Sequence, residues 1–402
     1  MARPRINIIT GLDIGSSEIK VLVAAQKEKE STVEVMSQIK VPSFGVRRGV
    51  VVDIEKVSNI IQPLFDRVKE EVGQEIGSVY VNINGSHLFS VSSRGLVAVS
   101  RADQKISEAD VERVLQSAKT ISLSSNKEIL EVFPKEYIVD GEGGIKEPIG
   151  MEGGRLEAEV LILAGFSPYK KNLTQAILNS NLQALDIIPS SIASSSAVLL
   201  PKQKELGVAV LDIGAGTSEL AVFKEDNLIH LAVFPIGSAN ITDDIAIGLQ
   251  TDINTAEMLK IEKGSCLPTK SSKKEKIETE TGILHFSQKG LTKIIEDRVS
   301  DIFELTQKEL KKIADQGLLP SGLVLTGGGA KMKGIVDLAK KKLKLPCRLG
   351  KPLSFLGLED DPIYSTVCGL VLQGIDLEDS PHIIDNKGLG AKIKKIFKIF
   401  IP

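Results

Sequence analysis

Cysteine and histidine are scarce in this sequence, and their positions exclude two kinds of site. The three cysteines, Cys266, Cys347 and Cys368, are odd in number and form no CxxC pair. This argues against a disulfide framework and favours a reducing compartment. The four histidines are scattered along the chain, so no cluster of metal ligands can be recognised.

Excess charge and long hydrophobic runs are also absent. Fifty Lys and Arg oppose 52 Asp and Glu, for a net charge of −2, so the basic excess of a protein that coats nucleic acid is missing. No window of about 18 apolar residues predicts a membrane span, and the N-terminus lacks the apolar core of a signal peptide. The 402 residues, 42% of them hydrophobic, can fill several cores, and we expect a soluble, cytosolic protein of two to three domains.

What the sequence does contain is an internal repeat. Residues 11–23 read GLDIGSSEIKVLV, and residues 210–223 read VLDIGAGTSELAVF. Each is an apolar run, an Asp-Ile-Gly turn and a second apolar run, which predicts a β-hairpin with a specialised turn. Two such hairpins suggest two similar domains made by duplication. A third unit, LVLTGGGAKMKGI at residues 323–335, predicts a strand, a glycine turn and the start of a helix.

Other segments predict the remaining organisation. Short β-rich stretches between residues 79 and 166, with an amphipathic helix at 107–118 capped by Ser107, indicate a separate module. Residues 268–282 are polar and charged, which favours a mobile surface loop over a binding patch. The acidic, proline-containing residues 376–386 are typical of a linker.

The glycine turns predict a phosphate site. Their small residues let backbone N–H groups approach phosphate oxygens, so two facing hairpins would hold a nucleotide tail from both sides. Asp13 and Asp212 suit a Mg²⁺ ion held through its waters, and Lys20 would supply a positive charge to the phosphates. Residues 327–329 would let a base or ribose lie close to the backbone.

This pattern resembles the actin, Hsp70 and sugar-kinase superfamily, whose members bind ATP between two duplicated α/β domains. The resemblance implies an α/β fold of two actin-like domains, each a five-stranded mixed sheet flanked by helices, with ATP and Mg²⁺ in the cleft. In the segment AEMLKIEK it places Glu257 and Lys260 near ribose and adenine. No catalytic residue is firm, with Asp13 and Asp212 as possible water-positioning carboxylates. The expected nucleotide-binding residues are Asp13, Gly15, Ser16, Ser17, Lys20, Asp212, Gly214, Gly216, Thr217, Glu257, Lys260, Gly327, Gly328 and Gly329.

A narrower resemblance covers nearly the whole chain. The segments NGSHLFSVSSRGLVAVS, ISEADVERVLQSAK, KEILEVFPKEYIVDG and VFPIGSANITDDIAIGLQT are similar to those of the FtsA family of bacterial cell division proteins. This implies a peripheral protein on the inner face of the cell membrane at the division site. It would tether polymers of the tubulin-like protein FtsZ, form filaments of its own and contact later division proteins. Arg298 and Asp301 match positions that face the FtsZ C-terminal tail, the alternative being ordinary charges on a helix surface.

The same resemblance predicts the domain boundaries. The first actin-like domain would comprise residues 1–84, 166–204 and 361–375, and the inserted assembly subdomain residues 85–165. The second actin-like domain would comprise 205–235 and 310–360, the small subdomain that docks the FtsZ tail 236–309, the linker 376–386 and a terminal amphipathic helix 387–402.

One position departs from the family pattern. Relatives usually carry Glu or Gln before the small-residue helix, near the expected attacking water, whereas IIPSSIASS places Ser190 there. Because a hydroxyl orients water less well than a carboxylate or amide, we expect ATP binding with at most slow hydrolysis.

The last 16 residues, KGLGAKIKKIFKIFIP, predict an amphipathic helix that lies on an anionic membrane. They carry five lysines and no acidic side chain, and their apolar residues share one helical face. The alternative is a helix docked on the second domain. The expected membrane-contacting residues are Leu389, Ile393, Ile396, Phe397 and Phe400, with Lys392, Lys394, Lys395 and Lys398.

Three other functions compete with a membrane adaptor. A small-molecule kinase needs a catalytic Asp between the domains, and none remains after Asp13 and Asp212 are assigned. A chaperone of the Hsp70 type needs a further substrate-binding region. The strongest alternative is the related ATP-binding protein of pilus assembly, which shares the expected fold and a similar insert. The lysine-rich terminal helix is not expected in that protein.

Overall fold

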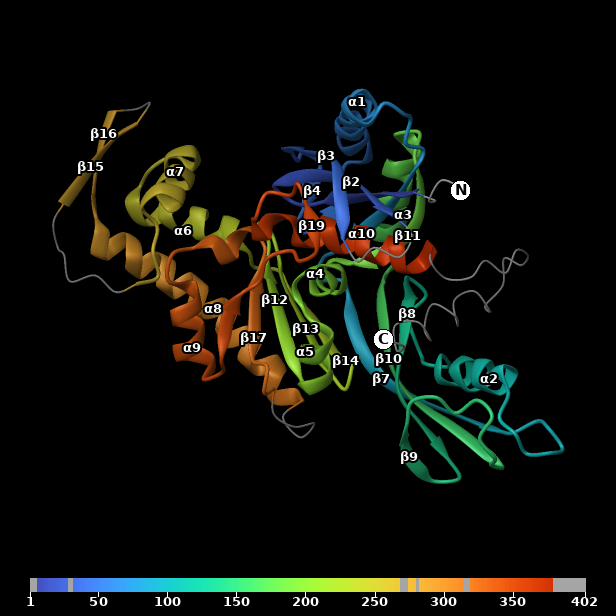
Figure 1. Cartoon of the computed structure of the whole chain (residues 1–402). Coiled ribbons are helices and arrows are strands. Elements are labelled where there is room, and N and C mark those ends of the chain that lie inside the picture. Colours follow the sequence, from blue (N-terminus) through green and yellow to red (C-terminus); the bar gives the residue numbers. More distant parts are fainter. Residues whose placement is uncertain (1–5, 28–31, 268–273, 280–281, 314–318, 379–402) are drawn as a thin grey trace.

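The computed structural model describes residues 6–27, 32–267, 274–279, 282–313 and 319–378. Two large β-sheets lie on either side of a central pair of helices, and a third sheet extends from one end (Figure 1). In the described part of the chain no helix is both long and apolar enough to cross a membrane.

The first large sheet contains the first predicted hairpin. Its strand order is β11–β6–β1–β2–β3–β19, with β1 antiparallel to β2 and parallel to β6. The expected number was five, and the sixth strand is a two-residue pairing with β3. The strands are β1 (Ile6–Ile14), β2 (Glu18–Lys27), β3 (Val33–Pro42), β6 (Ser78–Ile83), β11 (Gln183–Pro189) and β19 (Phe355–Leu356).

Helices cover both faces of this sheet. α1 (Ile54–Val72) and α3 (Ser167–Asn179) pack on one face, and α10 (Ser365–Glu378) with α4 (Ser190–Val198) on the other. The α1 helix begins at Asp53, whose side chain accepts a hydrogen bond from the Lys56 N–H, as expected of an N-cap. A short hairpin of β4 (Val46–Arg47) and β5 (Val50–Val51) precedes α1.

The second large sheet has the expected five strands, in the order β14–β13–β12–β17–β18. α8 and α9 pack on one side of it, while α4 and α5 contact β12 and β13, so α4 lies between the two domains. The elements are β12 (Val208–Ile213), β13 (Ser218–Lys224), β14 (Asn227–Phe234), β17 (Leu323–Thr326), β18 (Cys347–Leu349), α5 (Pro201–Leu206), α8 (Gln288–Lys312) and α9 (Ile335–Leu343), with single 3₁₀ turns η2 (Gly328–Lys331) and η3 (Pro362–Tyr364).

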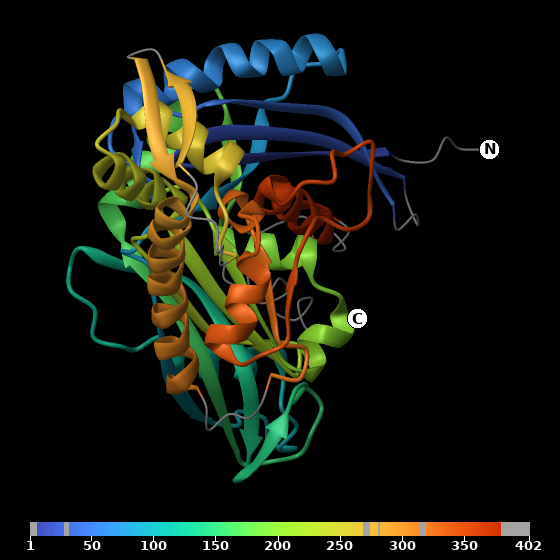
Figure 2. The same ribbon diagram turned by 90° about the vertical axis from the view of Figure 1, so that its left-hand side faces the viewer.

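A small group of elements projects from the second sheet. It consists of α6 (Ser238–Leu249), α7 (Ile253–Lys263) and the hairpin of β15 (Lys274–Thr279) and β16 (Gly282–Ser287), and Figure 2 shows this hairpin beyond one end of α8. The prediction of a loop at 268–282 was wrong for β15. There Ile277 pairs with Leu284 and packs against the second core, so alternation of charged and apolar residues produced a strand.

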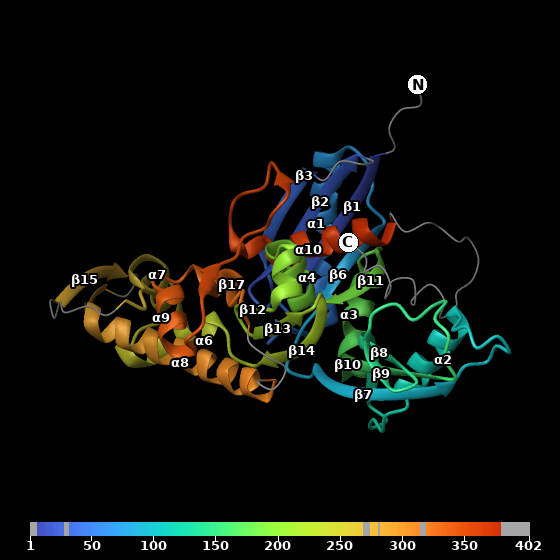
Figure 3. The same ribbon diagram turned by 60° about the horizontal axis from the view of Figure 1, so that its bottom comes forward.

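The inserted module forms its own sheet, in the order β7–β10–β8–β9, with α2 on one face. Figure 3 shows it at the opposite end of the molecule from α7. Ser107 and Asp110 form the predicted capping box of α2. The stretch at 79–83 belongs instead to the first sheet as β6, so the module begins after it. Its elements are β7 (Phe89–Ala98), α2 (Glu108–Ala118), β8 (Lys127–Val139), β9 (Glu142–Ile145) and β10 (Arg155–Phe166).

Two further boundaries differ from expectation. α10 continues to Glu378, so the linker prediction was wrong for residues 376–378, because Leu377 still packs against the first core. α8 continues across the predicted boundary between residues 309 and 310, so the helix does not end where the small subdomain was predicted to end. The division into subdomains otherwise stays a prediction.

Candidate functional site

The first hairpin turn brings a lysine between two carboxylates. Asp13 and Lys20 are cross-strand partners in β1 and β2. The Lys20 Nζ lies 3.4 Å from Asp13 Oδ2 and 3.6 Å from Glu18 Oε2. Burial raises the pKa of Asp13, and Lys20 opposes that rise. Burial also disfavours the charged form of Lys20, but Asp13 and Glu18 more than offset it and raise the pKa of Lys20. Lys20 therefore stays protonated.

Asn82, at the end of β6, fixes the other side of Asp13. Its Nδ2 donates to Asp13 Oδ1 at 2.9 Å and to Ser190 Oγ at 3.0 Å, and its Oδ1 accepts the Ile14 N–H at 2.7 Å. Ser190 Oγ is also 3.5 Å from the Ile83 carbonyl, to which it donates. Both amide protons of Asn82 and the hydroxyl proton of Ser190 are thus engaged within the protein.

The second hairpin turn repeats the geometry with a different charge. Asp212 and Glu219 are cross-strand partners in β12 and β13. Thr366 Oγ1 donates to Asp212 Oδ2 at 3.2 Å, and Glu219 Oε2 accepts the Ser191 N–H at 3.0 Å. Burial raises the pKa of Asp212 to about 6. Burial first, and the nearby Asp212 second, raise the pKa of Glu219 well above its usual value.

The third glycine unit and α7 complete the site. Lys260 Nζ lies 2.6 Å from Glu257 Oε2 and donates to Thr242 Oγ1 at 2.8 Å. Gly327 has a φ of 82°, and a Cβ there would lie 2.2 Å from Asp212 Oδ1, so only glycine lets this turn approach the carboxylate.

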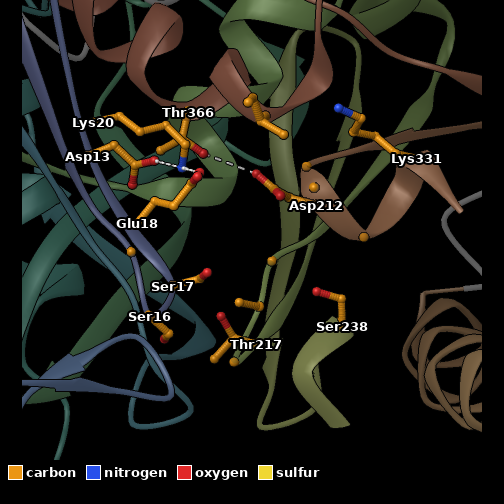
Figure 4. Close-up of a pocket in the computed structure, with 18 of the residues that line it drawn as sticks. Asp13, Ser16, Ser17, Glu18, Lys20, Asp212, Thr217, Ser238, Lys331 and Thr366 are labelled. Carbon is orange, nitrogen blue, oxygen red and sulfur yellow. Dashed lines mark hydrogen bonds and ion pairs between the residues drawn. The ribbon is translucent and has the colours of Figure 1, made fainter. Parts of the chain in front are cut away.

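These elements surround a cavity of about 550 Å³. Figure 4 shows Asp13, Glu18 and Lys20 gathered on one side and Asp212 on the other, with Ser16, Ser17 and Thr217 at the hairpin turns. The cavity brings together every nucleotide-binding residue expected from the sequence, and Ser190 as well. The expected residues that line it are Asp13, Gly15, Ser16, Ser17, Lys20, Asp212, Gly214, Gly216, Thr217, Glu257, Lys260, Gly327, Gly328 and Gly329. Their roles in binding stay predictions.

The cavity fits a phosphate chain with a hydrated Mg²⁺. A Cβ on Gly216 would lie 2.7 Å from Ser16 Oγ, so the two turns approach each other without side chains between them. Among the described residues, no group of three or more His, Cys, Asp or Glu could hold a metal directly. Two carboxylates suit an ion that keeps most of its water shell.

Several lining residues were not among those expected from the sequence, and five of them lie in the two hairpins or have side chains that bond to them: Glu18, Asn82, Asn84, Glu219 and Thr366. Two of them carried a signal. Asn82 follows an apolar run, and the carboxyl ends of parallel strands meet at one sheet edge. Glu219 stands at the same offset from Asp212 as Lys20 from Asp13, so aligning the repeat would have found it. The isolated Thr366 had no such signal.

The remaining predicted residues lie away from the cavity or outside the described chain. Arg298 on α8 forms two hydrogen bonds to Asp244 of α6, at 2.5 and 2.9 Å, and one to Asp301 at 3.1 Å. Arg298 and Asp301 are therefore neighbours on one face of α8, and the hydrogen bonds of Arg298 to Asp244 connect this face to α6. The predicted membrane residues, all within 387–402, lie outside the described residues.

Comparison with known proteins gives consistent matches. Residues 209–369 match the family model for cell division protein FtsA, and residues 85–164 match that for the SHS2 domain inserted in FtsA. Cell division protein FtsA of Pseudomonas aeruginosa is 36% identical over 375 residues, covering 92% of this chain and 89% of the relative. That of Bacillus subtilis is 35% identical, covering 90% and 82%.

Solved structures with low sequence identity share the fold. The PilM–PilN complex of type IV pilus biogenesis matches with a TM-score of 0.65 at 16% identity, covering 91% of this chain and 98% of the other. MreB5 of Spiroplasma citri bound to ADP matches with a TM-score of 0.54 at 12% identity, covering 98% of both chains. The actin-like architecture expected from the sequence is thereby confirmed.

Proposed function

We propose, since the chain belongs to the FtsA family of cell division proteins, that it is an ATP-binding adaptor which tethers FtsZ polymers to the inner face of the cytoplasmic membrane. The observation that carries the nucleotide part is the cavity, where two glycine turns and two buried carboxylates face each other. MreB5, which has the same fold, was crystallised with ADP. Asp13 and Asp212 would hold Mg²⁺ through water, and Lys20 would stay charged beside the phosphates.

ATP would act mainly as a structural ligand. Ser190 already accepts from Asn82 and donates to the Ile83 carbonyl, so its hydroxyl proton is not available to orient an attacking water. Burial raises the pKa of Glu219 well above its usual value, which favours the protonated form and would make this side chain a poor base. We expect single-turnover hydrolysis to be slow, on the order of minutes or longer per molecule. A turnover of about 10 s⁻¹, typical of an efficient enzyme, would contradict this.

The FtsZ tail would dock beside Arg298. The pairing of Arg298 with Asp244 and Asp301 holds its guanidinium at the surface between α6 and α8, where it is partly exposed. A guanidinium fixed in this way is well placed to bind a carboxylate of an incoming peptide. The small subdomain would be the docking site, and the insert would contribute to filaments and to contacts with later division proteins.

The lysine-rich residues 387–402 would anchor the adaptor. One such segment binds an anionic surface weakly, and a filament that presents many copies would bind firmly. The protein would therefore lie at the membrane of the division site when assembled.

Sedimentation with anionic liposomes tests the adaptor part of the proposal. The full-length chain should bring FtsZ down with the vesicles, and a chain that ends at Asn386 should leave both proteins in the supernatant. Arg298→Ala should still sediment but recover several-fold less FtsZ, whereas Lys293→Ala, which removes an exposed ion pair five residues earlier on α8, should recover the normal amount.

Two outcomes would contradict parts of the proposal. Sedimentation of the chain without FtsZ would favour an adaptor of the pilus-assembly type. Sedimentation that does not change on truncation at Asn386 would refute the role of the terminal segment.

A further inference from the structure

A short segment, residues 84–88, which we call the neck, joins the first sheet to the inserted module. The chain leaves β6 at Ile83, and the match to the inserted domain begins at residue 85. Asn84 itself lines the cavity, next to the turn of the second hairpin. The entry to the insert and the proposed phosphate site therefore share a residue.

Asn84 bonds in two directions. Its Nδ2 donates to Thr217 Oγ1 at 3.0 Å, across the boundary between the two domains. Its Oδ1 accepts the N–H of Gly85, the first residue of the insert. One carboxamide thus connects the second phosphate turn, where Thr217 is 3% exposed, to the first peptide of the insert.

The hairpin that follows Thr217 reaches the insert a second time. β13 begins at Ser218, and its partner strand β14 contacts β7 and β8. In Figure 1 these strands run side by side below the central helices. Three hydrogen bonds join this hairpin and its turn to the insert: Ser90 Oγ to the Leu231 carbonyl at 2.8 Å, Asn227 Nδ2 to the Lys135 carbonyl at 2.8 Å and Lys146 Nζ to the Glu225 carbonyl at 2.9 Å.

The neck contains His87, a side chain whose buried polar atoms are not paired with any described residue. Both ring nitrogens of His87 are buried and lack a hydrogen-bond partner among the described residues, although the ring packs edge-on against Tyr169 at 5.0 Å between centroids. Buried polar atoms are normally paired. A small displacement of the neck that admitted water to His87 would therefore be energetically favourable locally, and the bonds to Thr217 and β14 oppose it.

We propose that Asn84 couples occupancy of the phosphate site to the position of the insert, an inference that rests on the nucleotide binding proposed above. A phosphate oxygen beside Thr217 would accept the hydroxyl proton of Thr217. The Thr217 oxygen would then be a better acceptor for Asn84, since hydrogen bonds in a chain strengthen one another. Bound ATP would hold the neck and the insert against β14, and the empty site would release them.

Hydrogen exchange on the full-length chain, with and without a saturating non-hydrolysable ATP analogue, tests the coupling. In the unmodified chain, the peptide amides of residues 85–98 should exchange about fivefold more slowly with the analogue, as expected for one strengthened hydrogen bond. In Asn84→Ala, at an analogue concentration shown by titration to saturate that variant, the difference should disappear. Ser90→Ala is the matched control, because it loosens the insert without touching the cavity. It should speed exchange in both states and keep the ratio.

The outcomes separate this inference from the proposed function. A chain that binds the analogue but shows no change at residues 85–98, or an Asn84→Ala variant that keeps the full difference, would overturn the coupling alone. Absence of analogue binding by the unmodified chain would refute the nucleotide site itself. Thr217→Val removes the other partner with little change of shape. At an analogue concentration shown by titration to saturate this variant as well, it should abolish the difference as Asn84→Ala does, so a folding defect in one variant does not prevent the test.

Discussion

The two glycine hairpins of this protein have the same strand pairing but differ in the charge of the side chain across from their aspartate. Asp13 and Asp212 occupy equivalent positions, and the residue seven further along is their cross-strand partner in each case. That partner is Lys20 in the first hairpin and Glu219 in the second. The first carboxylate therefore faces a cation, and the second faces another acid.

The difference shows how one fold can place two equivalent carboxylates in different electrostatic surroundings. Asp13 is held by Lys20 and by the Asn82 amide. Asp212 has the hydroxyl of Thr366 but no ion pair in the described chain, and its pKa rises to about 6. An arriving Mg²⁺ would favour the ionised form most at a buried carboxylate that has no cation beside it. We infer that the second hairpin is the half that responds to the ligand.

Removing the cation from the first hairpin should have the largest effect. In Lys20→Met, Asp13 and Glu18 are left without their shared partner, and breaking a buried ion pair costs about 3–5 kcal/mol. Urea unfolding at pH 7.5 should show a loss of this size. Lys40→Met is the matched control, because Lys40 also pairs with Glu18, at 3.5 Å, but its side chain is 45% exposed. It should cost less than about 1 kcal/mol. Equal losses in the two variants would mean that the buried ion pairs of Lys20 contribute no more stability than the exposed ion pair of Lys40.

Neutralising the acid of the second hairpin should have the opposite sign. The folded-state pKa of Asp212 is raised from 3.8 to about 6, so the unmodified chain loses stability as the pH rises through this interval and the buried group ionises. The shift corresponds to about 3 kcal/mol. Asp212→Asn should therefore unfold at higher urea than the unmodified chain at pH 7.5 without nucleotide, and the gain should shrink towards pH 4.5.

The same substitution should weaken Mg²⁺-dependent ATP binding, because the amide cannot supply the negative charge. A variant that is destabilised at pH 7.5, or a gain that does not depend on pH, would show that burial does not raise the pKa of Asp212 in the free protein. The two hairpins would then be electrostatically alike.

The sequence predicted the backbone of this site better than its electrostatics. The glycine turns could be located because few residues tolerate their geometry, and the apolar runs beside them are unambiguous strands. The charge state of the carboxylates could not, since it depends on partners such as Asn82 and Thr366 that are distant in sequence. Both are brought close only by the parallel pairing of β6 with β1 and by the packing of α10.

The errors in the fold have similar causes. β15 was predicted as a loop because most of its residues are charged. Its alternating pattern forms a strand only when it pairs with β16. The end of α10 was predicted as a linker because composition does not reveal that Leu377 still finds apolar contacts. Residues whose role follows from local geometry could be predicted, and those whose role follows from tertiary contacts could not.

The smallest expected effect is that of Glu219→Gln, and it is the sharpest test of the asymmetry. Burial and the nearby Asp212 raise the pKa of Glu219 well above its usual value, and we predict from this that the side chain is a neutral acid in the free protein. A glutamine has the same shape, can accept the Ser191 N–H through its Oε1 and donates as a protonated carboxyl does. The free energy of unfolding at pH 7 should therefore change by less than about 1 kcal/mol. A loss of about 3 kcal/mol or more would mean that Glu219 is ionised and that an unrecognised cation serves the second hairpin as Lys20 serves the first.

Glu219→Ala measures how much stability is lost when the hydrogen bond itself is removed. It leaves the Ser191 N–H unpaired in a buried position and should cost about 1–3 kcal/mol. The expected order, with Gln close to Glu and Ala well below both, holds only if a proton, and not a metal or a lysine, neutralises Glu219 in the free protein.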